Sequence, residues 1–468
     1  MTSVLDRVSL QDFGTPAALP ELPASLYLER IAAAVGAARR ASLDALVVYA
    51  DREHFANMAY LTGFDPRFEE ALLVLGTDGT RKLVVGNECM GYLPDPALGL
   101  QVEIFQEFSL LGQPRGQSRP LRRILRDGGI RAGTKAGCVG WKYFHASPLI
   151  EGGAHAVDLP GYLVDLLRGL CGDAALVRNA TNLFMDPQDG LRVLNEPAQI
   201  AQFEYASCVT SAGVLDLLQH LTVGAAENDL EKYLDSRGLP LTCHRMISFG
   251  DKAKRGLASA TARRAVLGDA FTTAFGVTGA LTCRAGAVAS RAADLPPDLR
   301  DFYPRFARNY FDVVATWYEH LHVDATAADV FRAVQAVREP ALFDFAVNPG
   351  HYLHLDEWLH SPFAADSTVR LRSGMALQAD IIPVSNGPFC YVNAEDGIVL
   401  ADRELQSQLA ASFPDAWARM EARRTFVRDV IGIQLDDTVL PLSNIPAWLP
   451  PYALDPGSVL VRRPTRRT

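Results

Sequence analysis

The chain has 468 residues, of which 49% are hydrophobic and 21% are charged, a composition typical of a globular protein with two or three domains. Its formal net charge of -9 argues against a nucleic-acid partner, because such binding depends on Lys and Arg neutralising phosphates. The seven cysteines are scattered and form no C-x-x-C pair, which favours free thiols in a reducing compartment. The sequence shows no signal peptide and no apolar run of about eighteen residues, so a cytoplasmic protein that does not enter a membrane is predicted.

The N-terminal part of the sequence alternates between helix and strand patterns. Residues 1–24 are Pro-rich and aperiodic, and are predicted to form a mobile or surface-draped leader. Helical spacing follows from Leu26 to Arg40, and the run from Asp44 to Ala50 is typical of a buried strand. Further strands are predicted at 71–75, 82–85 and 135–139, and further helices at 119–126 and 162–170. This alternation predicts an α/β domain over residues 1–190.

The second half has long helices before and after a group of strands. The sequence Asn195-Glu196-Pro197 opens a predicted helix that ends near Leu221. Further helices are predicted at 228–237, 299–322, 327–338 and 403–430 (the last as one helix or a pair), and strands at 242–249, 270–276, 280–284, 352–357, 376–382 and 391–400. This order predicts an α+β domain over 191–435 with an antiparallel sheet flanked by long helices. A Pro-rich C-terminal extension over 436–468 is predicted to wrap the surface.

The stretch from Asn348 to Pro362 contains three of the ten histidines. In an extended strand, residues two apart share a face, so His354 and Asp356 are predicted to point together and His351 to point the other way. Imidazole and carboxylate groups together suit a divalent metal or general acid–base catalysis. A polar loop beside a turn is the alternative.

Asp380 is the second candidate, because it lies between two short apolar runs. A carboxylate in such a strand is costly to bury unless it is paired, hydrogen-bonded or metal-bound. Exposure on one side of the sheet is the alternative.

A Gly-rich segment from Thr272 to Gly286 is predicted to be a β-hairpin, since its glycines fit neither a dinucleotide fingerprint nor a Walker motif. Within it, Cys283 precedes Arg284, and a nearby guanidinium lowers a thiol pKa. Cys283 is therefore a candidate reactive thiol, with an ordinary packed cysteine as the alternative.

These stretches, in this order, resemble the creatinase/aminopeptidase P family over about residues 26 to 430. The string YLTGF at Tyr60–Phe64 is similar to the first-domain signature of the family. Gly350-His351 is similar to its metal-histidine motif, and the strands with Asp380 and Glu395 are similar to those that carry its two glutamate ligands. The resemblance implies a pita-bread fold and a homodimer.

The resemblance also implies a two-metal site with two Asp, one His and two Glu, from which this chain departs. Ala274 stands where the first aspartate is expected, Cys283 where the second is expected, and Asp380 replaces one glutamate. His351, Asp380 and Glu395 are still sufficient for one divalent ion (Zn, Mn or Fe), with Cys283 as a fourth ligand. A metal-free pocket in which two carboxylates share a proton is the alternative.

The resemblance thus implies a hydrolase acting on a C–N bond of a small amino-acid-like or short peptide substrate. Candidates for proton transfer or catalysis are His244, His354, His360 and Cys283, and candidates for binding a substrate carboxylate are Arg67, Arg245 and Arg284. A non-catalytic binding protein on the same fold, or a lyase or biosynthetic enzyme, remains an alternative.

Overall fold

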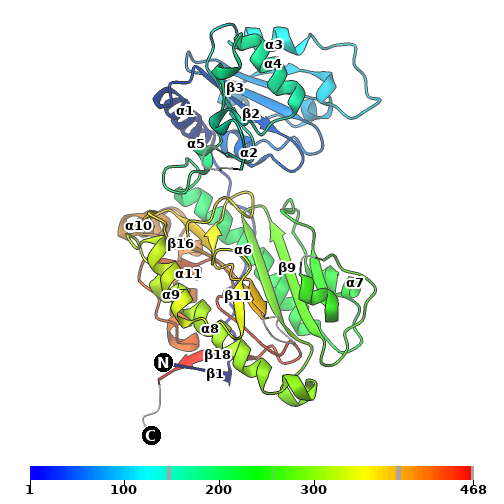
Figure 1. The fold of residues 1–468 in the computed structure, drawn as a ribbon, viewed down its shortest axis with the longest axis vertical. Helices are drawn as coiled ribbons and strands as arrows, with labels where there is room; N and C mark the ends of the chain where they lie inside the picture. The colour runs from blue at the N-terminus through cyan, green and yellow to red at the C-terminus, as the bar shows by residue number, and fades with distance from the viewer. Residues whose placement is uncertain (145–148, 257, 386–391, 465–468) are drawn as a thin grey trace. The chain divides into compact units, whose positions relative to one another are not determined.

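The computed structural model describes residues 1–144, 149–256, 258–385 and 392–464. The chain forms two compact units, one of Leu22–Val193 and one of Met1–Glu21 together with Leu194–Thr468. Figure 1 shows the ribbon of both units. No helix among the described residues is long and apolar enough to cross a membrane.

The domain boundaries proposed from the sequence stay a prediction. The contacts within the chain place both of its ends in the C-terminal unit. Residues 1–21, which the sequence assigns to the N-terminal domain, belong to the C-terminal unit. The segment 436–468 belongs to the same unit.

The N-terminal unit is built on a six-stranded sheet with the order β5-β4-β3-β2-β6-β7 (Figure 1). Its strands are β2 (Ala45–Ala50), β3 (Ala71–Gly76), β4 (Arg81–Val85), β5 (Gln101–Ile104), β6 (Ala136–Val139) and β7 (Val177–Asn179). Strand β2 pairs antiparallel with β3 and parallel with β6. Every residue of β2 and β3 is buried, which explains why both read as continuous apolar runs.

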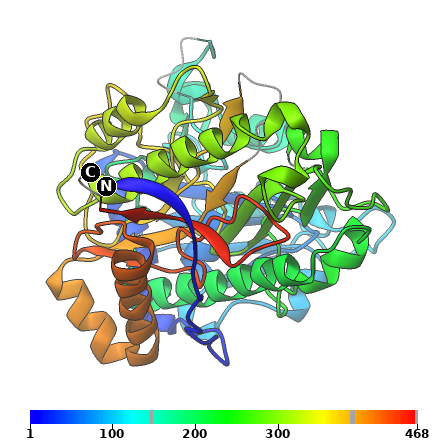
Figure 2. The ribbon, with the colours of Figure 1, turned by 90° about the horizontal axis from the view of Figure 1, so that it is seen from below.

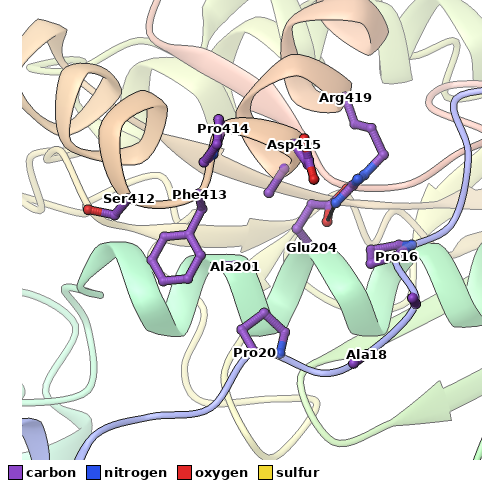
Figure 3. Close-up of a pocket in the computed structure, with 12 residues that line it drawn as sticks. Pro16, Ala18, Pro20, Ala201, Glu204, Ser412, Phe413, Pro414, Asp415 and Arg419 are labelled. Atoms are coloured by element: carbon purple, nitrogen blue, oxygen red, sulfur yellow. Dashed lines mark hydrogen bonds and ion pairs between the residues drawn. The ribbon is translucent and has the colours of Figure 1, made fainter.

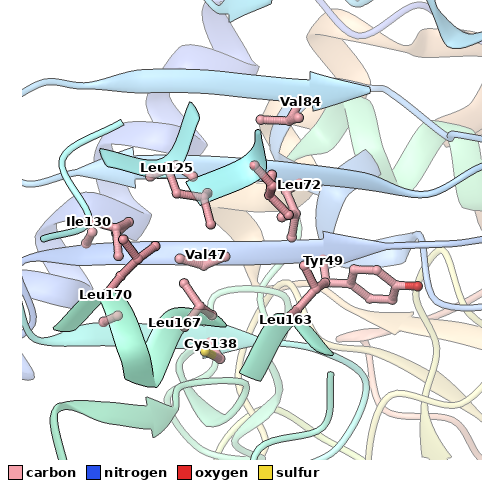
Figure 4. Close-up of a cluster of buried hydrophobic side chains, with 14 of the residues drawn as sticks. Val47, Tyr49, Leu72, Val84, Leu125, Ile130, Cys138, Leu163, Leu167 and Leu170 are labelled. Carbon is pink, nitrogen blue, oxygen red and sulfur yellow. The ribbon is translucent and has the colours of Figure 1, made fainter. Parts of the chain in front are cut away.

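The helices of this unit are α1 (Ala24–Arg40), α2 (Ala56–Thr62), α3 (Leu121–Asp127), α4 (Gly161–Cys171) and α5 (Asn182–Met185). The predicted helices at 26–40, 119–126 and 162–170 are thus present. Figure 4 shows Leu125 of α3 and Leu163 and Leu167 of α4 in one buried cluster with Val47 and Leu72 of the sheet. This cluster is the core of the unit on that face of the sheet.

The C-terminal unit contains two four-stranded antiparallel sheets, with the orders β15-β10-β9-β8 and β12-β13-β16-β17. The strands of the first are β8 (Met246–Phe249), β9 (Ala270–Val277), β10 (Ala280–Ala287) and β15 (Asn393–Glu395). Those of the second are β12 (His351–Tyr352), β13 (Ala376–Gln378), β16 (Gly397–Leu400) and β17 (Val439–Pro441). Only Asp396 separates β15 from β16, so the chain passes from one sheet directly into the other at this residue.

The principal helices of the unit are α6 (Pro197–His220), α8 (Phe302–His320), α9 (Ala327–Val337), α10 (Arg403–Ser412) and α11 (Pro414–Phe426). Helix α6 packs on β9 and β10, and α11 packs on β17. The helix predicted over 228–237 is wrong in length, because α7 (Glu227–Leu230) and one 3₁₀ turn end at Tyr233. The backbone of Arg237 is left-handed, with φ of 48°, which no helix accommodates.

The two ends of the chain form a small sheet of their own. Strand β1 (Thr2–Arg7) pairs antiparallel with β18 (Ser458–Arg463) along its whole length, and Figure 2 shows the blue and red strands side by side. Of the two alternatives predicted for the leader, mobile or surface-draped, the mobile one is wrong for its first residues, because they form a paired strand. The C-terminal segment is also largely buried: Ile445 and Leu449 are fully inaccessible to solvent. No local pattern reveals a pairing between opposite ends of a chain.

After β1, the leader runs over α6, where the Gln202 side chain donates a hydrogen bond of 2.8 Å to the Pro20 carbonyl. Figure 3 shows a pocket of about 330 Å³ between this part of the leader, α6 and the start of α11. Arg419 donates two hydrogen bonds of 2.8 Å to the carboxylate of Glu204 in its wall. The pocket includes no residue that the sequence predicts to be functional.

Glu204 gives the stability of this region a defined pH dependence. Burial alone would raise the pKa of its carboxyl, but the guanidinium groups of Arg419 and Arg423 outweigh burial and lower that pKa below its ordinary value. A lowered pKa in the folded state stabilises the protein above the unfolded-state pKa of about 4.3, and this stabilisation is lost as the pH falls through the folded-state pKa. We expect the melting temperature of the wild type to fall more steeply than that of Glu204→Gln as the pH drops from about 6 to about 3.

Thermal unfolding followed by circular dichroism over this pH range measures the difference. Glu404→Gln is the matched control, because Glu404 is exposed in the same unit and should leave the slope unchanged. Equal slopes for the wild type and Glu204→Gln would show that the two arginines do not stabilise the carboxylate.

Candidate functional site

Three side chains from distant parts of the sequence lie together in the C-terminal unit. His351 lies on β12, Asp380 follows β13, and Glu395 lies on β15, so both sheets contribute. All three are buried, and their ligand atoms lie within 4.8 Å of one another. No other group of three or more His, Cys, Asp or Glu residues shares this geometry in the described part of the chain. A metal-binding role stays a prediction, but the residues named for it are neighbours.

Gly350 fixes the position of His351 relative to Asp380. Its N–H donates a hydrogen bond of 2.7 Å to the Asp380 carbonyl, and its φ is 97°. A Cβ here would lie 2.9 Å from the Trp317 ring and 3.0 Å from the Gln378 carbonyl. Only glycine satisfies both requirements.

The imidazole of His351 is oriented by its own chain. Its Nδ1 lies 3.1 Å from the Tyr352 carbonyl, which leaves Nε2 for the carboxylates. Nε2 is 3.9 Å from Asp380 Oδ2 and 3.9 Å from Glu395 Oε1. On the other side of Glu395, Gln378 Nε2 donates to the same oxygen at 3.3 Å.

Two further residues at this site were not predicted. Glu357 Oε1 lies 2.9 Å from His351 Nε2, and Trp358 stacks on the imidazole with ring centres 4.2 Å apart. Both belong to the histidine-rich stretch, which was their only signal in the sequence. The Glu357 side chain is 23% exposed, so it is the group of the cluster that water reaches most easily.

The ionisable groups of the site shift one another's pKa values. Burial raises the pKa of Asp380 well above its ordinary value, and the nearby Glu395 carboxylate raises it further. Burial also raises the pKa of Glu395, although His351 opposes this effect. Burial would lower the pKa of His351, but the carboxylate of Glu357, with Glu395 and Asp380, raises it well above its ordinary value. A cation at the centre of these groups is therefore favoured, whether it is a proton or a metal ion.

The donor set fits a divalent ion. Asp380 Oδ1 is buried without a hydrogen-bond partner among the described residues, a costly state for a carboxylate unless it is protonated or binds a cation. One imidazole nitrogen and two carboxylates are ligands that Zn, Mn and Fe accept.

Cys283 is next to this centre but differs from its prediction. It pairs across the ladder with Glu395 on one side and with Ala274 on the other. Burial raises the pKa of its thiol well above the ordinary value, and the nearby carboxylates of Glu395 and Asp380 raise it further. The Arg284 guanidinium lowers this pKa, but its effect is smaller. The expectation of a lowered thiol pKa is therefore wrong.

Arg284 points to the opposite face of β10 from Cys283, as alternation along a strand requires. It is 1% exposed and binds both carboxylate oxygens of Asp396, at 2.9 and 2.8 Å. Its other hydrogen bonds go to the carbonyl oxygens of Cys283, Glu395, Ile445 and Trp448. Every N–H of the guanidinium is used, so none is left for the substrate carboxylate predicted from the sequence.

The structure does not bring His354 and His360 into the cluster of three. His354 is fully buried and packs edge-to-face on Phe203, with ring centres 5.4 Å apart. His360 is half-buried, and its Nδ1 lies 3.1 Å from the Ser361 carbonyl. Their proposed role in proton transfer stays a prediction.

The remaining candidates lie in loops. His244 is exposed and precedes β8, and the adjacent Arg245 donates a hydrogen bond of 2.7 Å to the Leu234 carbonyl. Arg67 belongs to the N-terminal unit, where it is exposed, has φ of 63° and lies 3.7 Å from Asp65. A substrate role for Arg67 or Arg245 stays a prediction.

Comparison with solved structures identifies the fold. The chain is similar to the prolidase of Pyrococcus horikoshii OT3 at a TM-score of 0.59 and 15% identity, over 80% of this chain and 95% of that one. It is similar to dipeptidase PepE of Mycobacterium ulcerans at 0.59 and 18%, over 81% and 95%. It is also similar to an Xaa-Pro dipeptidase of Bacillus anthracis at 0.59 and 14%, over 82% and 96%. The chain has the pita-bread fold.

The matches to known proteins are all solved structures of low sequence identity. No family model matches the chain, and no curated protein sequence matches it. At identities of 14 to 18%, a shared fold does not carry over an activity. Function therefore has to be argued from the side chains described above.

Proposed function

We propose that this protein is a hydrolase that cleaves a C–N bond of a small amino-acid-like or short peptide substrate. The observation that carries the proposal is the buried cluster of His351, Asp380 and Glu395, with ligand atoms within 4.8 Å of one another. Solved structures of the same fold are named as prolidases and dipeptidases, which supports a peptidase-like reaction. As in the family that the sequence resembles, we infer a homodimer, which light scattering tests directly.

His351, Asp380 and Glu395 would hold one Zn, Mn or Fe ion. Such an ion, when bound, makes a water molecule acidic and polarises a carbonyl group. The hydrogen bond from Gln378 holds the Glu395 carboxylate in place, and the Tyr352 carbonyl fixes the tautomer of His351.

Glu357 is placed to move protons. It contacts His351 and is partly exposed, so it can exchange protons with water at the edge of the cluster. If the centre works without a metal, the two buried carboxyl groups of Asp380 and Glu395, with ligand atoms within 4.8 Å, do not both ionise, and the protonated member serves as a general acid.

Metal analysis of protein purified without chelator tests the centre. We expect about one Zn, Mn or Fe per chain, lost in His351→Ala, because a site with three protein ligands does not keep its ion after losing one. His320→Ala is the matched control, since His320 ends α8, where its Nδ1 lies 2.9 Å from the Thr316 carbonyl. Hydrolysis of a dipeptide and amidine panel should fall about 100-fold or more in His351→Ala.

The proposal would be contradicted if the wild type hydrolysed a substrate of the panel and His351→Ala kept the same metal content and the same activity as the wild type. The masses of the products separate a hydrolase from a lyase, because only hydrolysis adds a water molecule across the broken bond.

A non-catalytic binding protein is the second candidate, and one observation favours it. Ala274 and Cys283, which face each other across the β9–β10 hairpin, supply no carboxylate where the resemblance expects an aspartate pair. In addition, Asn393 donates a hydrogen bond of 3.3 Å to the Cys283 sulfur, which occupies this sulfur and makes it less available as a metal ligand. Calorimetric binding of a peptide that is recovered intact would identify this function.

A further inference from the structure

A second candidate site lies in the N-terminal unit, at the edge where the parallel strands β2 and β6 end. Strands β2 and β6 are neighbours in the sheet. Strand β3, which follows β2 in the chain, pairs with the other edge of β2, and β7, which follows β6, pairs with the other edge of β6, so the strand order runs in opposite directions from this pair. In open α/β sheets, ligands bind in the crevice outside the carboxyl ends of the strands at such a switch point. A pocket of about 160 Å³ lies there, lined by residues that follow β2, follow β6 and precede α4.

The backbone around this pocket is fixed before any ligand arrives. A Cβ at Gly140 would overlap the Asp158 carbonyl oxygen, so the loop after β6 and the loop before α4 meet too closely for any other residue. Asn57 donates a hydrogen bond of 2.8 Å to the Gly140 carbonyl, and the Gly140 N–H donates to Thr181 at 3.0 Å. The pocket therefore does not have to be ordered by its ligand.

One part of the pocket presents His54 paired with the carboxylate of Asp51. Asp51 accepts the backbone N–H groups of Glu53 and His54 at 2.9 and 2.8 Å, and its carboxylate lies 3.1 Å from His54 Nδ1. The hydrogen bond to Asp51 raises the pKa of His54, against the effect of burial, and the Asp158 charge adds to the rise. His54 Nε2 has no hydrogen bond to the described residues, so it is available as a donor to a ligand.

Another lining residue, Asp158, presents a carboxylate. Asp158 Oδ2 accepts the backbone N–H groups of Trp141 and Lys142 at 3.1 and 2.8 Å, which fixes the carboxylate and leaves its other oxygen for a ligand. The Trp141 ring, 42% exposed, lies 5.0 Å from the His54 ring and provides an apolar surface. Figure 4 shows Tyr49 of β2 at the margin of the core, with its hydroxyl pointing away from the cluster.

We propose that this pocket binds a free amino acid, with the Asp158 carboxylate accepting hydrogen bonds from its ammonium group and His54 donating one to its carboxylate. A zwitterion matches a fixed carboxylate and a fixed N–H donor, and neither a simple amine nor a simple acid satisfies both. The volume of about 160 Å³ is below the 300–1,000 Å³ that drug-sized ligands occupy, which suits so small a molecule. The inference goes beyond the proposed function and does not depend on the cluster around His351.

Isothermal titration of the full-length chain tests the proposal, with L-alanine, L-leucine and L-proline as probes. Propionate and ethylamine each retain only one of the two charges. Each should bind at least about tenfold more weakly than the amino acids, as expected when a hydrogen bond to a charged group is lost. Asp158→Asn, which keeps an oxygen for the two backbone N–H groups, and His54→Gln should each weaken binding by about the same factor.

Two control variants show whether the amino acid binds in this pocket. Asp173→Asn should bind like the wild type, because Asp173 also accepts a backbone N–H, from Ala175, but lies outside the pocket. His351→Ala should also bind like the wild type, which separates this site from amino-acid binding at the proposed catalytic centre. The absence of binding by all three amino acids at about 10 mM, or equal binding by the wild type and both pocket variants, would overturn the proposal. The series of ligands on the wild type keeps the test valid if a variant fails to fold.

Discussion

Replacing Arg284 by methionine is expected to lower the free energy of unfolding by about 3–5 kcal/mol, because Asp396 would keep its buried charge without a partner. Both residues are 1% exposed. The guanidinium also bonds to the carbonyl oxygens of Cys283, Ile445 and Trp448, so it ties β10 to the C-terminal segment. Buried carbonyls that lose a donor add to the cost. Urea unfolding followed by circular dichroism and tryptophan fluorescence measures the change.

Two further variants make this test specific to the buried pair. Arg291→Met should leave the midpoint of unfolding unchanged, since Arg291 is 79% exposed and such ion pairs contribute little. The double variant Arg284→Met with Asp396→Leu should recover much of the loss, because no buried charge stays unpaired. Wild-type stability of Arg284→Met combined with weaker substrate binding would support the substrate role predicted from the sequence.

The contrast between Cys283 and Arg284 shows how far strand patterns can be used. The hairpin of β9 and β10 could be predicted from its apolar runs and glycines, and neighbouring residues on a strand must face opposite sides. Cys283 and Arg284 were nevertheless both predicted for one site, although this alternation places their side chains on opposite faces of the sheet. Which of them faces the site depends on the pairing of Cys283 with Glu395, and no local pattern gives a pairing between distant segments.

The histidine-rich stretch could be found from the sequence, but its geometry could not. A strand was predicted over 352–357, whereas β12 ends at Tyr352. The Tyr352 N–H donates to the His360 carbonyl, and the Tyr352 carbonyl accepts the Leu359 N–H, so the chain folds back on itself. The two-residue alternation fails in such a loop, which explains why Glu357 contacts His351 and why His354 packs on Phe203.

Replacing Asp380 by asparagine is expected to affect the metal-free and the metal-loaded protein in opposite directions. The pKa of Asp380 lies well above its ordinary value because of burial and the nearby Glu395 carboxylate. A group with a raised pKa in the folded state costs stability as the pH rises through that pKa, and a neutral amide removes this cost. At about pH 8, chelator-treated Asp380→Asn should therefore melt at a higher temperature than the wild type, by about 2–4 °C for each kcal/mol gained.

Added metal should reverse the order. A saturating ion at about 100 times its dissociation constant stabilises the wild type by about 2.7 kcal/mol, whereas an amide is a poorer ligand than a carboxylate and should raise the required metal concentration by about 10–100-fold or more. Peptide hydrolysis should fall with metal occupancy. Melting curves with and without Zn or Mn measure both effects, with Asp366→Asn, at an exposed aspartate of the same unit, as the control that changes neither. An Asp380→Asn variant that is less stable without metal and as strongly stabilised by it as the wild type would place Asp380 outside any ion site.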